Sequence, residues 1–180
     1  KQKKKMTSKT SKILMKEHEN ILKVIENLEN ECNDIKTGKE MNKRFLGNAI
    51  DFIRNYADKF HHAKEEDILF KEFDKSAEEG CVHCNPTKQM LSEHDEGRKF
   101  VKGIEQGVKE NNKNKVIENA RSYCQLLKEH IYKEDNILYP MTDETLNEQI
   151  KRDMLKKFKK IEIERKKEKE KYLAFVKGLK

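Results

Sequence analysis

The chain contains few of the residues that interrupt regular structure. Seven glycines and two prolines occur in 180 residues, and tryptophan is absent. This scarcity excludes a many-stranded sheet and a proline-rich linker, because both need frequent turns. No stretch approaches the roughly 20 apolar residues of a membrane span, and no apolar signal core follows the basic start. We therefore expect long helices in a soluble, cytoplasmic protein that does not contact a membrane.

Cysteine is also scarce. Cys32, Cys81, Cys84 and Cys124 are too few and too far apart for a disulfide framework in a chain of this length. Cys81 and Cys84 lie in a predicted loop with His83 between them, and three roles stay open for them: structural thiols, a thiol redox switch or part of a metal site. Cys32 and Cys124 lie on or beside apolar helix faces, so we expect both to be buried as small hydrophobic residues.

The middle of the chain has no excess of positive charge. This holds although charged residues make up 41% of the sequence and the net charge is +7. Residues 1–16 hold seven lysines and no acidic residue, and residues 150–180 hold 13 basic against five acidic residues. The central part is therefore acidic, and we expect no nucleic-acid partner. Residues 1–5 precede the first methionine, Met6, and whether they belong to the natural chain stays open.

Apolar residues recur at steps of three and four in four segments, as expected of one buried helix face. The segments are residues 11–35, residues 41–76, a helix that begins near Pro86, and a helix that follows the polar turn 111–114 and ends at Pro140. A further helix with sparse apolar positions is predicted over residues 144–179. The sequence therefore predicts an all-α bundle with an additional C-terminal helix.

Two parts of the chain repeat each other. The sequence HHAKEEDILF, which starts at His61, aligns with HIYKEDNILY, which starts at His130, and five of the ten positions are identical. Similarly, Glu-His-Glu around His18 aligns with Glu-His-Asp around His94. The body of the chain is thus a helical hairpin used twice, and its two-fold arrangement predicts that the equivalent histidines lie near one another.

Each predicted helix carries ionisable residues within its apolar face: His18, His61 and Glu65, His94, and His130 and Glu134. A single histidine in such a place is usually a hydrogen-bonded core residue, but four at matching positions favour a shared ligand. A histidine and a glutamate four residues apart project from one face of a helix and can bind one ion. Four imidazoles and two carboxylates are too many for one zinc ion and suit two non-haem irons, with the carboxylates as bridges.

This pattern resembles the hemerythrin-like family, also called HHE cation-binding domains, over residues 12–142. The resemblance is carried by His18, His61-x-x-x-Glu65, His94 and His130-x-x-x-Glu134, and by the sequences HHAKEEDILF, EHDEGR and HIYKEDNILYP around them. It implies an up-down four-helix bundle, between a basic N-terminal extension of residues 1–11 and a basic C-terminal helix of residues 143–180. It also implies two non-haem irons with an oxo or hydroxo bridge, four terminal histidine ligands and two bridging glutamates.

The sequence departs from the oxygen-carrying members of the family at two positions. Those members have a second histidine one turn along the third helix, where this chain has Arg98, and an aspartate five residues after the last histidine, where Asp135 lies beside the better-aligned Glu134. His62 can supply the missing imidazole; the alternatives are a solvent-facing His62 or one that supports another ligand. Arg98 weakens the expectation of reversible O2 carriage more than that of a metal centre.

The expected function follows from the number of ligands. Seven side chains and a bridging oxygen leave one iron with an open position for O2, nitric oxide or peroxide, and the apolar residues Ile21, Ile53, Leu127 and Ile137 are expected to keep water out. We expect a binding or sensing protein rather than an enzyme. Two alternatives stay open: a di-iron enzyme that turns over peroxide, nitric oxide or Fe(II), and a metal-free helical interaction module. A protein partner or a homodimer is compatible with each.

Overall fold

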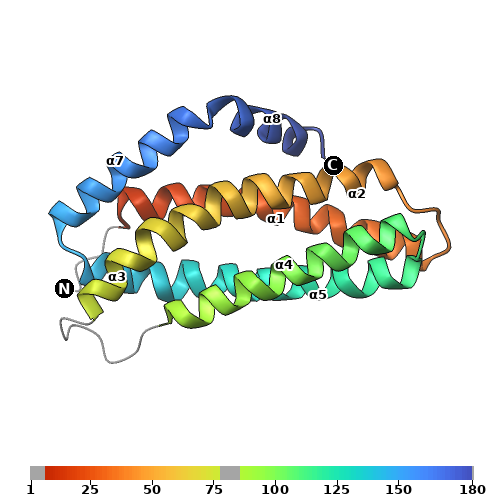
Figure 1. The fold of residues 1–180 in the computed structure, drawn as a ribbon, viewed down its shortest axis with the longest axis horizontal. Helices are drawn as coiled ribbons and strands as arrows, with labels where there is room; N and C mark the ends of the chain where they lie inside the picture. The colour runs from red at the N-terminus through yellow and green to blue at the C-terminus, as the bar shows by residue number, and fades with distance from the viewer. Residues whose placement is uncertain (1–6, 78–85, 180) are drawn as a thin grey trace, which may run out of the picture.

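Four helical rods lie side by side in a computed structural model that describes residues 7–77 and 86–179 (Figure 1). The first rod is α1 (Lys9–Lys36), and the third is α4 (Thr87–Lys109). The second joins α2 (Lys43–Phe52), η1 (Ile53–His62), η2 (Glu65–Leu69) and α3 (Phe70–Ser76), and the fourth joins α5 (Lys113–Lys133), η4 (Glu134–Leu138) and α6 (Tyr139–Thr145). No β-strand occurs in these described ranges, and the predicted all-α bundle is confirmed.

Short polar side chains set where the rods begin. The side-chain oxygens of Ser8, Asn42 and Asn112 each accept a hydrogen bond from the backbone N–H three residues further on, at the starts of α1, α2 and α5. After α1 the chain turns at Gly38, whose φ of +98° favours a residue without a Cβ. The helices therefore break at residues 37–42 and 110–112, close to the predicted gap between the first two segments and to the predicted polar turn.

The second and fourth rods contain π-helical stretches, labelled η1, η2 and η4. A π turn holds one more residue than an α turn, so it shifts the buried face along the sequence. Ile137, predicted on the buried face, is 50% exposed, whereas the next residue, Leu138, is buried. Pro140 does not end the helix as predicted. It lies in the first turn of α6, where its missing N–H is tolerated, and the helix continues to Thr145.

The apolar core consists of two clusters at different levels of the bundle. On α1, Leu14 belongs to one cluster and Ile21 to the other, with His18 between them. On α4, Met90 and Val101 belong to different clusters in the same way, with His94 between them. The candidate metal ligands therefore lie at the level where one apolar cluster gives way to the other, shielded from solvent on both sides along the bundle axis.

The predicted C-terminal helix is two helices, α7 (Glu148–Glu164) and α8 (Lys166–Lys177), which break at Arg165. Both run along one side of the bundle (Figure 1). Helix α7 buries Met154 and Phe158 against the bundle, and α8 buries Tyr172 and Val176. The sparse apolar positions of this basic segment are thus enough to hold it on the surface of the four rods.

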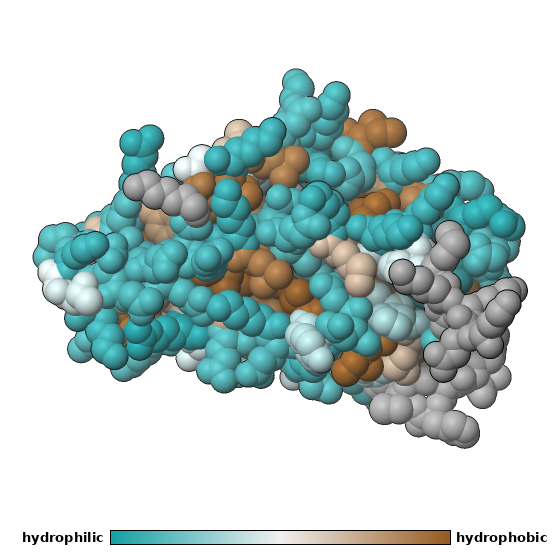
Figure 2. All heavy atoms as spheres, turned by 180° about the vertical axis from the view of Figure 1, so that it is seen from behind, coloured by the Kyte–Doolittle hydropathy of each residue, from teal (hydrophilic) through white to brown (hydrophobic). Residues whose placement is uncertain are grey.

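Charged side chains cover the outer faces of the helices. Figure 2 shows a face that is mainly hydrophilic with small hydrophobic patches. None of the helices within residues 7–77 and 86–179 is long and apolar enough to cross a membrane. Cys32 and Cys124 are buried free thiols, as predicted. Cys81, His83, Cys84 and the lysines of residues 1–5 lie outside the described residues.

Candidate metal centre

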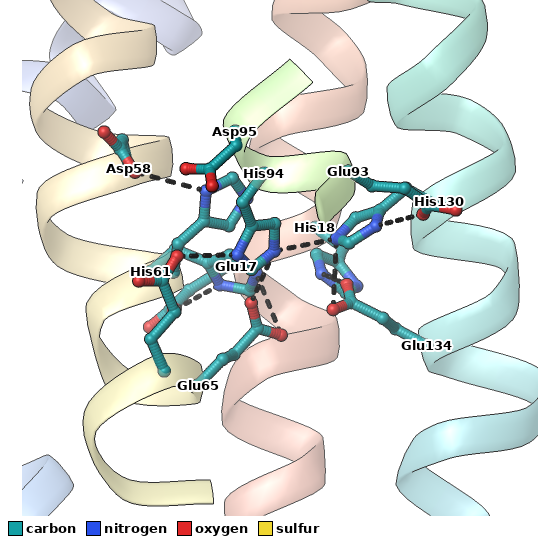
Figure 3. A network of polar contacts seen from close by, with 12 residues as sticks. Glu17, His18, Asp58, His61, Glu65, Glu93, His94, Asp95, His130 and Glu134 are labelled. Carbon is teal, nitrogen blue, oxygen red and sulfur yellow. Dashed lines mark hydrogen bonds and ion pairs between the residues drawn. The ribbon is translucent and has the colours of Figure 1, made fainter. Parts of the chain in front are cut away.

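The seven residues predicted as ligands are all buried and lie together inside the bundle. They form two sets of potential ligand atoms, each with its atoms within 4.8 Å of one another. Glu65 belongs to both sets. One set, here called the three-histidine set, is completed by His62, His94 and His130; the other, the two-histidine set, is completed by His18, His61 and Glu134. These side chains converge from all four rods (Figure 3).

Each of the two glutamates lies between histidines of different sets. One oxygen of Glu134 is 3.1 Å from Nε2 of His130, and the other is 3.2 Å from Nε2 of His18. One oxygen of Glu65 is 3.6 Å from Nε2 of His61, and the other is 3.6 Å from Nε2 of His94. Both carboxylates therefore have the placement that a bridge between two cations requires.

The outer nitrogen of each histidine faces a carboxylate. The Nδ1 atoms of His18, His61, His94 and His130 lie 2.7–2.8 Å from oxygens of Asp135, Glu17, Glu66 and Glu93, respectively, and Nδ1 of His62 lies 3.5 Å from Asp58. Such a contact fixes the ring orientation and makes the other nitrogen a stronger donor to a metal. In the four close pairs the Nε2 atom is left facing the centre of the site.

Sequence reasoning did not assign any of these five carboxylates as a partner of a histidine, although the internal repeat contains a signal for four of them. Glu17 and Glu93 each precede a candidate ligand, His18 or His94, at equivalent positions of the repeat. Each carboxylate holds a histidine of the neighbouring rod rather than its sequence neighbour. Similarly, Glu66 and Asp135 each follow a candidate glutamate. An acidic residue directly beside His18, Glu65, His94 and Glu134, repeated in both halves, was the available signal for four of the five carboxylates; Asp58 has no such signal.

A lysine completes each of the two equivalent contacts. Lys64 donates to Glu17, and Lys133 donates to Glu93, so the two halves contain matching lysine, glutamate and histidine groups. The environments differ, because the side chain of Lys64 is fully buried whereas that of Lys133 is 27% exposed. Lys64 also contacts Glu162 of α7 at 3.2 Å. The C-terminal helices therefore reach the polar groups behind the candidate centre.

His62 faces inward, which agrees with the ligand interpretation and not with the solvent-facing one. Its ring is buried and stacks on that of His94 at 3.8 Å between centroids. Arg98, at the position of the missing family histidine, turns to the surface, where it pairs with Asp58 and Glu66. Arg98 thus holds the carboxylates that face His62 and His94.

The electrostatics of the site divide four of its histidines into two pairs, one with a raised and one with a lowered pKa. Burial alone would lower the pKa of His18, but the hydrogen bond with Asp135 and the close contact with Glu134 outweigh it and raise the pKa to about 10. Burial would also lower the pKa of His130, but the contacts with Glu134 and Glu93 outweigh it and raise the pKa to about 10. These two imidazoles hold the pKa of Glu134 well below its usual range in spite of burial.

His61, His62 and Glu65 favour their neutral forms. Burial, followed by the charges of neighbouring imidazoles, lowers the pKa of His61 and of His62 well below the usual value. Burial and the nearby charge of Glu134 raise the pKa of Glu65 well above its usual range. A cluster of this kind cannot ionise fully by itself, and a cation among these groups would favour their deprotonated forms.

Unpaired buried atoms show that the site suits a cation. Nε2 of His61, Oε2 of Glu65 and both oxygens of Glu134 are buried without a hydrogen-bond partner. Leaving such atoms unpaired is costly, and coordination would satisfy them. Imidazole nitrogens mixed with carboxylate oxygens are the donors that first-row transition metals prefer.

Tyr139 adds a hydroxyl to the two-histidine set, and sequence reasoning missed it as well. The hydroxyl donates a hydrogen bond to Glu65 and lies 3.4 Å from Nε2 of His18. Phe70 occupies the equivalent position of the repeat, so only one half of the site carries this group.

Three of the four apolar residues that were expected to keep water out of the site, Ile21, Ile53 and Leu127, are buried.

Comparison with known proteins identifies the family over most of the chain. The family model described as Hemerythrin HHE cation binding domain matches residues 9–142. This range includes all seven candidate ligands and the five carboxylates behind the histidines, and it ends before α7. Comparisons with curated proteins and with solved structures found no match.

Proposed function

Because this chain belongs to the hemerythrin HHE cation-binding family, we propose that it holds two non-haem irons and binds or senses O2, nitric oxide or peroxide. The observation that carries the proposal is the division of seven buried donors into two sets that share Glu65, with Glu134 also between them. Two irons in such a site would supply reversible electron transfer and an open position for a small oxidant.

The protein residues have separate tasks in this proposal. His62, His94 and His130 would hold one iron, His18 and His61 the other, and Glu65 and Glu134 would bridge. The carboxylates behind the histidines keep each ring oriented, so that the donor atoms need little rearrangement when a cation binds. The apolar clusters on both sides exclude bulk water from the site.

Metal analysis of the purified chain tests the proposal. We expect two irons per chain after anaerobic loading with Fe(II) and exposure to air, together with near-ultraviolet and visible absorption typical of an oxo-bridged diferric centre. Replacing Glu134 by glutamine is expected to reduce the iron content by at least one per chain. Glu129→Gln, at an exposed position of the same rod, is the matched control and should keep both irons.

A protein that remains colourless and free of iron after this treatment would refute the proposal. If wild type and Glu134→Gln bound equal amounts of iron, the centre would have to lie elsewhere. Circular dichroism of each variant shows whether a loss of iron reflects a lost ligand or a lost fold.

One observation favours an enzyme as a second candidate. The buried hydroxyl of Tyr139 donates to Glu65, and burial raises the pKa of this tyrosine well above its usual value, so the hydroxyl keeps its proton. A retained proton beside the site suits the reduction of peroxide, which consumes protons. Consumption of many equivalents of hydrogen peroxide per chain, with a supplied reductant, would distinguish turnover from stoichiometric binding, and Tyr139→Phe should slow it.

A further inference from the structure

The C-terminal helices contact the stretch of the second rod that carries three of the candidate ligands. The guanidinium of Arg165, at the break between α7 and α8, donates a hydrogen bond of 2.7 Å to the backbone oxygen of Lys59 in η1. Glu162 of α7 accepts a hydrogen bond of 3.2 Å from Lys64, which lies between η1 and η2. Both contacts come from helices beyond residues 9–142, the range of the family match. Helices outside the matched range therefore hold the stretch that carries the ligands.

The buried ammonium group of Lys64 is surrounded by three side chains. An ammonium group has three hydrogen-bond donors and no acceptor. Lys64 donates to the carboxylates of Glu17 and Glu162, and its nitrogen lies 3.7 Å from the centre of the Phe60 ring. Because its side chain is fully buried, bulk water cannot replace a lost partner. Without Glu162, the charge of Lys64 would depend on Glu17 as its one carboxylate among the described residues.

Glu17 connects Lys64 to a candidate ligand. Its Oε1 atom accepts the hydrogen bond from Lys64, and its Oε2 atom lies 2.8 Å from Nδ1 of His61. A carboxylate only accepts hydrogen bonds, so Nδ1 carries the proton of the ring, and the unpaired Nε2 atom keeps its lone pair for a cation. Glu162, Lys64, Glu17 and His61 thus form a continuous polar chain, in which a displaced carboxylate would also turn the ring.

The equivalent chain in the other half of the repeat has no contact with the C-terminal helices. Lys133 donates to Glu93, which also contacts Nδ1 of His130 at 2.8 Å. The side chain of Lys133 is 27% exposed, and Glu93 is its one ion-pair partner within residues 7–77 and 86–179. The two halves therefore provide an internal comparison, because α7 holds the lysine of the first half and solvent reaches the lysine of the second.

We propose that Glu162 is a positioning residue for the two-histidine set: it holds Lys64 against Glu17 and thereby directs the ring of His61 toward the cation. The inference deepens the proposed function and rests on it for its effect on iron, although the position of the ring can be measured without metal. Removing the partner behind a metal ligand commonly weakens metal binding about 10–100-fold. Because Glu162 acts through Lys64 and Glu17, we expect an effect at the lower end of this range.

Nuclear magnetic resonance of the metal-free chain tests the position of the ring. The Nδ1 proton of His61, assigned by its loss in His61→Gln, should be protected from exchange with water. Glu162→Ala is expected to shift this signal and to speed its exchange, whereas the signal of His130 should not change. Lys157→Ala is the matched control, because it removes another ion pair between α7 and the second rod, the pair with Glu72 at 3.1 Å. It should leave both signals unchanged.

Anaerobic titration with Fe(II) gives the second measurement. Wild type and Lys157→Ala should bind two irons with the same affinities. Glu162→Ala should bind one of the two irons about tenfold more weakly and the other unchanged. Glu162→Gln keeps a side-chain oxygen that can accept from Lys64, so its affinity should lie between those of wild type and Glu162→Ala. Circular dichroism confirms that each variant is folded.

Glu162→Ala with an unchanged His61 signal, or with wild-type affinities for both irons, would overturn the inference. Equal changes in the signals of His61 and His130 would also overturn it, because they would show a general loosening of the bundle. A wild-type chain that binds no iron would instead refute the proposed function, and the His61 signal of Glu162→Ala would still show whether Glu162 positions the ring.

Discussion

Lys64 and Lys133 occupy equivalent positions of the internal repeat but differ in burial. Lys64 is fully buried between Glu17 and Glu162 and lies 3.7 Å above the ring of Phe60, whereas Lys133 reaches solvent. Removing one partner of a buried ion pair leaves an uncompensated charge and costs about 3–5 kcal/mol. We therefore expect Lys64→Met to lower the free energy of unfolding by about this amount, measured by urea denaturation without metal.

Lys133→Met is the matched control and should cost about 1 kcal/mol or less, as is usual for exposed pairs. Adding Glu17→Gln to Lys64→Met should recover part of the lost stability, because the unpaired buried charge is removed as well. Equal effects of the two lysine variants would contradict the difference in burial on which the prediction rests.

At the scale of single residues, the sequence predicted the buried histidines and glutamates of the site but not the carboxylates that contact the histidines. The histidines and glutamates could be found because each lies in an apolar helix face, where a polar residue is conspicuous. Their carboxylate partners lie at the edges of those faces, where acidic residues are common in a chain with 41% charge. Only the pairing of rods in three dimensions shows that Glu17 holds His61 of a different helix.

The π-helical stretch η4 determines which residues of the fourth rod are buried. A regular α-helix would bury Ile137, but the widened turn buries Leu138 instead. We expect Leu138→Ala to lower the free energy of unfolding by about 2–5 kcal/mol, the usual cost of removing a buried leucine side chain. Ile137→Ala should change it by about 0.5 kcal/mol or less, as for most surface substitutions. Urea denaturation of both variants checks the register, and the reverse order of effects would contradict it.

Periodicity predicted the rods well but could not predict these stretches. Apolar residues at steps of three and four fit a regular α-helix and also a helix that contains one widened turn. The two differ only in which residues are buried after that turn. Four of the five candidate ligands on the second and fourth rods lie within π-helical stretches: His61 and His62 in η1, Glu65 in η2 and Glu134 in η4. Tertiary packing decides between the α-helical and the π-helical turn, because several polar side chains must point to one centre. Such packing cannot be read from the local sequence.

The C-terminal helices lie beyond the range of the family match but share the core of the bundle. Phe158 of α7 is fully buried in the same apolar cluster as Leu14, Phe73 and Met90. We expect Phe158→Ala to lower the free energy of unfolding by about 3–5 kcal/mol, and to do so in a single transition, because α7 and the rods share one cluster. Ile163→Ala, on the same helix at 76% exposure, is the control and should have little effect. A separate early transition in wild type would show that α7 unfolds independently.

On the scale of the whole molecule, charge is arranged in layers. The outer faces carry most of the charged residues and are solvated (Figure 2), whereas the interior holds a compact set of ionisable groups between two apolar clusters. The net charge of +7 comes from the ends of the sequence and says little about the centre. The stability of the fold should therefore respond to pH mainly through the few acidic and basic groups in and around the site.

Two carboxylates behind the histidines should make the fold sensitive to acid. A hydrogen bond from His94, assisted by Arg98, lowers the pKa of Glu66 to about 2, and hydrogen bonds from His130 and Lys133 outweigh burial and lower that of Glu93 to about 2. A lowered pKa in the folded state contributes stability that is complete above the ordinary value of about 4.5 and is lost as the pH falls toward 2. The free energy of unfolding without metal should therefore fall over this range.

Glu93→Gln should reduce the slope of that fall, because glutamine still accepts hydrogen bonds but does not titrate. Its stability near neutral pH should be lower than that of wild type, since the charge beside His130 and Lys133 is lost, and the two curves should converge only as the pH falls to about 2. Glu129→Gln, at an exposed position of the same bundle, should follow wild type throughout. Urea denaturation at a series of pH values measures all three curves. Parallel curves for wild type and Glu93→Gln would show that this carboxylate is not an important source of the acid sensitivity, and would leave Glu66 and the buried histidines His61 and His62 to account for it.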